Sequence, residues 1–113
     1  MRAFNRSSGK DLALRLSVAA SVLSRARGLL GRRGLAEGEG LLIRPCSGVH
    51  TFLMQFPIDV VFLDQENRII HAVENLQPQR MTRVLFRSSS VLELPAGTVF
   101  SSGSAVGHQV VIE

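Results

Sequence analysis

The sequence predicts a mainly β protein, namely a compact β-sandwich or a partly open, jelly-roll-like barrel of seven to eight short strands with one short N-terminal helix. Short apolar runs alternate with turn-forming glycine, proline, asparagine and serine residues along most of the chain. Only residues 21–30 have clear helical periodicity. The length of 113 residues suits a single domain with one core. We expect residues 1–11 to be loosely held and residues 12–112 to form the β domain.

The most apolar stretch, residues 50–64, is predicted to form the centre of the core. Residues 58–64 (IDVVFLD) are apolar on both faces of an extended chain, which is typical of a strand covered on both sides. Residues 50–55 (HTFLMQ) can also run extended, and Pro57 marks the bend between the two segments. We expect the buried spine to consist of three side chains from this stretch: Phe52, Ile58 and Phe62.

Two elements are predicted before the turn-rich residues 34–40. Residues 12–18 (LALRLSV) alternate between apolar and other side chains, which indicates a half-buried strand. Residues 21–30 form a short helix that Ser21 can cap and that Gly31 can end. Gly28 is unfavourable inside a helix, and its presence indicates that another part of the backbone passes close by.

The elements after this helix are short. Asp64 precedes QENR and can cap a hairpin loop with its own side chain. The remaining predicted elements are a strand at residues 41–43, an antiparallel partner of the central strand at 68–73, strands at 84–86 and 91–94, a single helical turn at 98–103 and a closing strand at 109–112.

Basic residues are concentrated in the first part of the chain. Residues 1–44 hold nine arginines and lysines against three acids, whereas residues 45–113 carry a net charge of −2. We expect a solvated arginine-rich face. Nucleic-acid binding is not expected, because no aromatic residues are interleaved with the basic ones. The alternative is a binder of an anionic surface, using four arginines: Arg25, Arg27, Arg32 and Arg33.

Targeting signals and disulfides are not expected. No run reaches the roughly 18–20 apolar residues that span a bilayer. Arg15 interrupts the one N-terminal run that imitates a signal peptide, so we expect a cytoplasmic protein. Cys46 is the single cysteine and cannot form an internal disulfide.

Cys46 and His50 lie four residues apart across a glycine-containing turn and are candidate catalytic residues. An adjacent imidazole can activate a thiol, so the two could form a nucleophile–base pair. With Asp59 they also supply ligand types that zinc accepts, although the spacing matches no established metal motif and no cofactor is expected. We favour a structural interpretation over both: a buried apolar cysteine and a histidine bonded to a backbone carbonyl.

Asp59 and Glu93 are acids flanked by apolar residues within predicted strands. A carboxylate in such surroundings must find donors or lie at an edge. We expect structural ion pairs with an arginine, and the alternative is that they line a polar pocket. The candidate arginine partners are Arg27, Arg32 and Arg44.

Several blocks occur together in an order that resembles one protein family. They are RARGLLGRRGL at residues 25–35, GEGLLI at 38–43, TF-x-M at 51–54, IDVVFLD at 58–64 and VLELPAG at 91–97. The ordered set resembles the bacterial and archaeal family of domain of unknown function 192. The resemblance implies a small β-rich, sandwich-like fold with no assigned activity, in a family whose relatives often look exported. The chain departs from the common pattern at Leu53, Gln55 and Phe56, and at His108, where the family usually has an acid.

The interpretation we favour is a non-enzymatic binding or accessory module for a small ligand or a protein partner, with a cleft near the Cys46–His50 turn. The expected binding residues are His50, Met54, Asp59, Glu93 and Arg32. The alternatives are a small metal- or thiol-dependent hydrolase that uses Cys46 and His50, and the anionic-surface binder described above.

Overall fold

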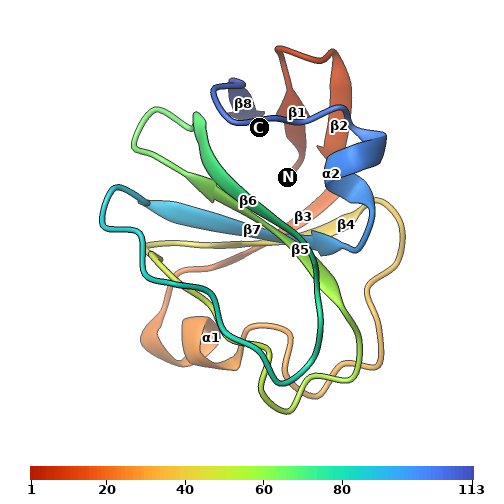
Figure 1. Cartoon of the computed structure of the whole chain (residues 1–113), viewed down its shortest axis with the longest axis vertical. Helices are drawn as coiled ribbons and strands as arrows, with labels where there is room; N and C mark the ends of the chain where they lie inside the picture. Colours follow the sequence, from red (N-terminus) through yellow and green to blue (C-terminus); the bar gives the residue numbers. More distant parts are fainter.

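In the computed structural model, which describes residues 1–113, eight strands form two sheets and are accompanied by two short helices (Figure 1). The elements in chain order are β1 (Ala3–Asn5), β2 (Lys10–Ala13), β3 (Arg15–Ala19), α1 (Val22–Arg27), β4 (Glu39–Ile43), β5 (Ile58–Leu63), β6 (Ile69–Leu76), β7 (Ser90–Pro95), α2 (Thr98–Ser101) and β8 (Val110–Ile112). The three-stranded sheet has the order β2-β1-β8, and the five-stranded sheet has the order β3-β4-β7-β5-β6. The predicted mainly β class is confirmed.

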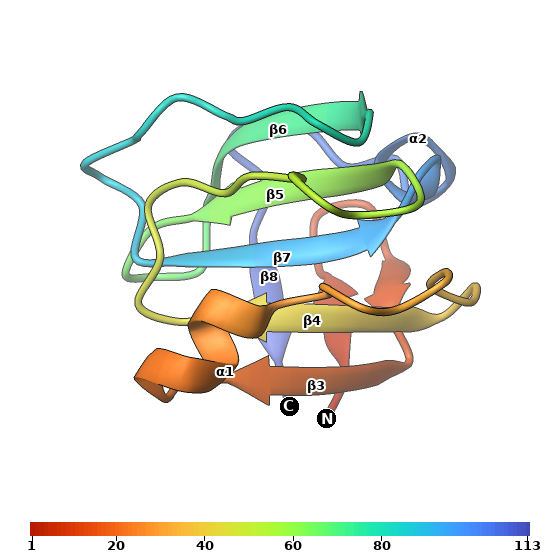
Figure 2. The same ribbon diagram turned by 90° about the horizontal axis from the view of Figure 1, so that it is seen from below.

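The five-stranded sheet is the middle layer of the molecule, with apolar side chains on both faces. One face packs against the three-stranded sheet through a cluster that includes Val61, Leu92 and Leu94. The other face carries a second cluster, which includes Val60 and Phe62 and is covered by loops and by the residues that follow α1. Figure 2 shows the five strands side by side, with α1 lying over the ends of β3 and β4. None of the helices is long and apolar enough to cross a membrane.

Strand β5 confirms the prediction of a strand covered on both sides, because all its residues are buried. Ile58 and Phe62 are fully buried as expected, but Phe52 is 41% exposed, so its place in the buried spine is wrong. Residues 50–55 do not form a strand, since Leu53 has a φ of 66° in a turn. The buried hydroxyl of Thr51 holds this segment against the loop that follows β6, because it donates to Gln77 O at 2.6 Å.

The N-terminal residues differ most from expectation. Residues 1–11, expected to be loosely held, instead form β1 and the first half of β2, and β1 lies between β2 and β8 with both of its edges paired. The single strand expected at residues 12–18 is divided at Leu14 between β2 and β3, which belong to different sheets. The alternation of apolar and polar residues along a sequence indicates which side chains are buried. It does not indicate to which sheet each residue belongs.

The other elements follow the prediction with two further corrections. The strands β4, β6, β7 and β8 and the helical turn α2 occur where they were expected, and β6 pairs antiparallel with β5. Ser21 caps α1 through the backbone N–H of Ser24, but the helix ends at Gly28 with a φ of 49° rather than at Gly31. The strand expected at residues 84–86 is absent, and the side chain of Phe86 in that loop is 95% exposed.

Asp59 is fully buried on the face of β5 that packs toward α2. Its Oδ1 accepts a hydrogen bond from the backbone N–H of Asn75 at 2.8 Å. Its Oδ2 accepts from the N–H groups of Gly97 at 3.1 Å and Val99 at 2.8 Å. The expected ion pair with an arginine is therefore wrong. Backbone donors satisfy the carboxyl group, which ties β5 to the end of β6 and to the start of α2.

Asp59→Ala should destabilise the protein by about 3 kcal/mol or more, because it leaves three buried N–H groups without an acceptor. Asp64→Ala is the matched control, since Asp64 accepts from the N–H groups of Glu66 and Arg68 in a solvent-accessible turn and should cost only about 1 kcal/mol. Urea unfolding of both variants measures the difference. Equal losses for the two variants would show that the Asp59 network is not a main tie of the fold.

Candidate functional site

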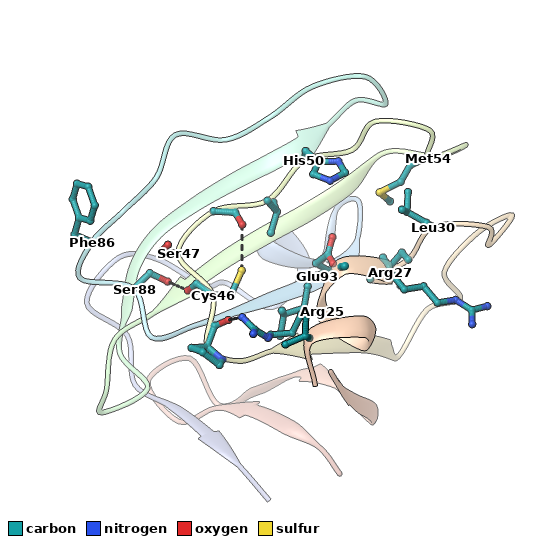
Figure 3. Close-up of a pocket in the computed structure, with 18 residues that line it drawn as sticks. Arg25, Arg27, Leu30, Cys46, Ser47, His50, Met54, Phe86, Ser88 and Glu93 are labelled. Carbon is teal, nitrogen blue, oxygen red and sulfur yellow. Dashed lines mark hydrogen bonds between the residues drawn. The ribbon is translucent and has the colours of Figure 1, made fainter. Parts of the chain in front are cut away.

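A cavity of about 720 Å³ opens on the face of the five-stranded sheet that α1 partly covers (Figure 3). Its walls come from α1 and the turn after it, from residues 43–50 and from the loop that carries Phe86 and Ser88, with Met54 completing the lining. Glu93 of β7 lies on the cavity floor. Ligand pockets typically have volumes of about 300–1,000 Å³, so the size of this cavity suits a small organic ligand.

The end of α1 passes directly over Glu93. A Cβ atom at position 28 would lie 3.4 Å from Glu93 Oε1, so Gly28 allows the turn to approach the carboxyl group closely. The positive φ of Gly28 also suits glycine better than any other residue. The close approach expected at Gly28 is present, but its partner is a side chain rather than a backbone segment.

Glu93 is a buried carboxyl group without a protein partner. It lies in register between Leu41 of β4 and Val60 of β5, and only 3% of its surface is exposed. No hydrogen bond or ion pair to its side chain is present in the structure. Burial alone raises the pKa of Glu93 to about 7. The group therefore changes charge near neutral pH and faces a cavity large enough for a ligand.

Arg25 provides a second polar group in the cleft. Its Nη1 donates to Pro45 O at 3.1 Å, whereas its Nε is buried and has no hydrogen-bond acceptor. Arg25 and Glu93 form no ion pair with each other. The guanidinium group of Arg27 points away from the cleft, as Figure 3 shows.

Cys46 and His50 both line the cleft but do not form the nucleophile–base pair that was considered as an alternative. The thiol of Cys46 donates to Gly48 O at 3.2 Å, and burial raises its pKa. His50 Nδ1 accepts from the backbone N–H of Phe52 at 3.3 Å, and the two rings stack with their centroids 5.3 Å apart. An elevated thiol pKa is the opposite of what a nucleophilic cysteine needs.

The structure brings together four of the candidate residues and separates two others. Cys46, His50, Met54 and Glu93 all line the cleft. Asp59 lies on the opposite face of the sheet, so the set Cys46, His50 and Asp59 does not assemble into a zinc site, and no other group of three potential ligands is present. Arg32 lies outside the cleft and pairs with Glu39 at 3.4 Å.

Several residues of the cleft have no functional signal in the sequence. The sequence indicates Arg25 only as part of an anionic-surface binder, and it assigns the apolar lining residues to no site. These lining residues include Val22, Leu29, Leu30, Ile43 and Val49. The only available signal was Gly28, whose position inside a helical pattern indicated a close approach.

Comparisons with known proteins place the chain in a family and identify its fold. The profile of the family DUF192, described as "Uncharacterized ACR", matches residues 3–112. A crystal structure of a protein of unknown function from Novosphingobium aromaticivorans DSM 12444 has a TM-score of 0.85 and 21% identity, covering 97% of this chain and 82% of that one. A crystal structure from Sinorhizobium meliloti 1021, of a protein whose description suggests a transcription regulator, has a TM-score of 0.81 and 26% identity, covering 97% of this chain and 89% of that one.

No curated protein matches the chain. The two solved structures have a similar fold, and the family profile covers nearly the whole length of this chain. The chain therefore belongs to the family of domain of unknown function 192.

Proposed function

We propose that the protein is a non-enzymatic binding module that takes a small ligand in the cleft between α1 and the Cys46–His50 segment. The observation that carries this proposal is the Glu93 carboxyl group, which is buried at the cleft floor without a partner. Buried polar groups are normally hydrogen-bonded, because an unpaired one costs free energy. A ligand with a hydrogen-bond donor would supply the missing partner and recover that cost on binding.

The rest of the lining supports a ligand with an apolar body. Leu29, Ile43 and Met54 belong to the apolar cluster on this face of the sheet and also border the cleft. Binding sites for small molecules combine such a lining with a few convergent polar groups. Glu93 and Arg25 are those groups here, so the cleft can both desolvate and orient a ligand.

The two alternative functions receive less support. A thiol-dependent hydrolase needs an activated cysteine, whereas burial raises the pKa of Cys46 and His50 makes no hydrogen bond to it. An anionic-surface binder needs free arginines. Arg25 instead donates to the Pro45 carbonyl and Arg32 pairs with Glu39, so two of its four arginines are already engaged.

Screening a fragment library by ¹H–¹⁵N correlation spectra tests ligand binding directly. Fragments that bind should give saturable shifts confined to the cleft, for example at Gly28, Val49 and Glu93. Ser47→Trp should weaken the binding at least about tenfold by filling the cleft, since the Ser47 side chain lines it without a hydrogen bond. Ser17→Trp, at an exposed position outside the cleft, is the control. Shifts elsewhere, or equal affinity in the two variants, would rule out this cleft.

The Glu93 carboxyl group should make folding depend on pH. Its pKa is raised from 4.5 to about 7, so between these values the folded protein keeps a proton that the unfolded chain has lost. The stability supplied by this group is therefore present below the unfolded pKa and declines as the pH rises toward the folded pKa. Relative to the wild type, Glu93→Gln should gain roughly 3 kcal/mol in free energy of unfolding between about pH 4.5 and pH 8.

Urea unfolding of the wild type and Glu93→Gln across this pH range measures that gain. Glu74→Gln is the matched control, because Glu74 is exposed on β6 and its replacement should give a difference that is constant with pH. A constant difference for Glu93→Gln as well would show that Glu93 is not buried in its uncharged form.

The thiol of Cys46 should react slowly with iodoacetamide. The thiolate is the reacting species, and burial raises the pKa of Cys46, so half-maximal rate should come at a higher pH in the folded protein than in the urea-unfolded chain. His50→Ala should leave this pH unchanged. A lower half-maximal pH in the folded protein that rises in His50→Ala would instead support the thiol-dependent enzyme.

A further inference from the structure

We propose that the ligand of this cleft is a small apolar zwitterion of the amino-acid and short-peptide class, whose protonated amine pairs with Glu93 and whose acceptor oxygen pairs with the guanidinium group of Arg25. This inference rests on the proposed binding function and specifies the chemistry of its ligand. It follows from the polar groups that the folded chain leaves unpaired on the cleft wall.

Most polar side chains that line the cleft already have partners. The Cys46 thiol donates to Gly48 O, and His50 Nδ1 accepts from the backbone N–H of Phe52. Ser88 Oγ donates to Cys46 O at 2.8 Å, and Figure 3 shows this contact at the cleft edge. The charged groups that line the cleft with unused hydrogen-bonding capacity include the carboxyl of Glu93, which needs a donor, and the guanidinium of Arg25, which bonds only to Pro45 O. The Ser47 hydroxyl also lines the cleft without a partner, but it carries no charge.

Glu93 and Arg25 lie in one part of the cleft but are not in contact. No ion pair joins them, although Glu93 is buried, Arg25 is half-buried, and each would gain from an opposite charge. Both lie within electrostatic reach of Cys46, because Glu93 raises the pKa of that thiol and Arg25 lowers it. A ligand with a donor and an acceptor can therefore bridge the space between them.

A protonated amine suits Glu93 better than a neutral donor. Ionising a buried carboxyl group is unfavourable without a compensating charge, and an ammonium group brings that charge together with its N–H donors. Hydrogen bonds between charged partners are also about twice as strong as those between neutral ones. An oxygen acceptor on the same ligand can pair with the guanidinium group of Arg25, whose one hydrogen bond in the structure is to Pro45 O.

The apolar part of the ligand has a matching surface. The cleft wall includes Leu29, Leu30 and Val49, and two exposed apolar side chains, Val22 and Phe86, border the mouth. Val22 comes from α1 and Phe86 from the loop before β7, so an apolar ligand can contact both elements. Covering such side chains would remove apolar surface from water.

The test measures binding of dileucine, N-acetyl-dileucine and dileucine amide by titration of the ¹H–¹⁵N spectrum. Acetylation removes the ammonium group and should weaken binding to the wild type about tenfold or more. Amidation removes the terminal carboxylate and should weaken it several-fold. In Glu93→Gln the effect of acetylation should fall below about threefold, whereas the effect of amidation should persist.

Arg25→Gln should show the reverse pattern, losing the effect of amidation and keeping the effect of acetylation. Arg33→Gln is the matched control, and it should leave all three affinities unchanged because Arg33 is exposed and lies outside the cleft lining. Glu74→Gln is the matched control for Glu93→Gln, and it should leave all three affinities unchanged because Glu74 is exposed and lies outside the cleft.

Two failures can be told apart. Neutral apolar fragments can bind the cleft while the three peptides do not, or the peptides can bind the wild type and Glu93→Gln equally well. Either result would overturn the proposed zwitterionic ligand and leave the proposed binding function standing. If neither fragments nor peptides shift the cleft resonances, both proposals are wrong.

Discussion

Burial of β5 and β7 on both faces is the constraint on which the rest of the structure depends. Every side chain of β5 and nearly every one of β7 is removed from water, so a polar residue on either strand must be paired or must face a cavity. Each strand carries one carboxyl group. Asp59 points toward α2 and accepts three backbone N–H groups, whereas Glu93 points to the other side and has none. The same chemical group is structural on one face and available to a ligand on the other.

The two faces differ because different elements cover them. The three-stranded sheet closes one face over a continuous apolar cluster that includes Val61 and Leu94. The other face is covered by long loops and by a six-residue helix that ends at Gly28. A helix this short cannot cover a five-stranded sheet, and the turn after it approaches Glu93 without closing over it. The cleft is therefore a direct result of how little regular structure lies on this side.

The polar groups of the cleft are the basis of the proposed binding function. The Cys46 thiol and the His50 ring are each engaged by nearby backbone, and Asp59 is on the far face of the sheet. Glu93 has no partner, Arg25 bonds only to Pro45 O, and the two side chains form no ion pair, which is the arrangement on which the proposed binding function rests. The matches to the family and to two solved structures establish the fold, and the function has to be argued from this cleft.

The sequence by itself determined the features that depend on neighbouring residues. These are the doubly buried strand at residues 58–63, the Asp64 turn, the Ser21 cap and the mainly β class, because periodicity and capping are local properties. It also singled out Cys46, His50, Met54 and Glu93, which share the cleft. Only the tertiary structure decided that Phe52 is exposed, that residues 12–18 serve two sheets, and that Asp59 finds donors while Glu93 does not. Those outcomes depend on contacts between residues far apart in the chain, such as Val99 with Asp59, 40 residues apart, and no local pattern specifies them.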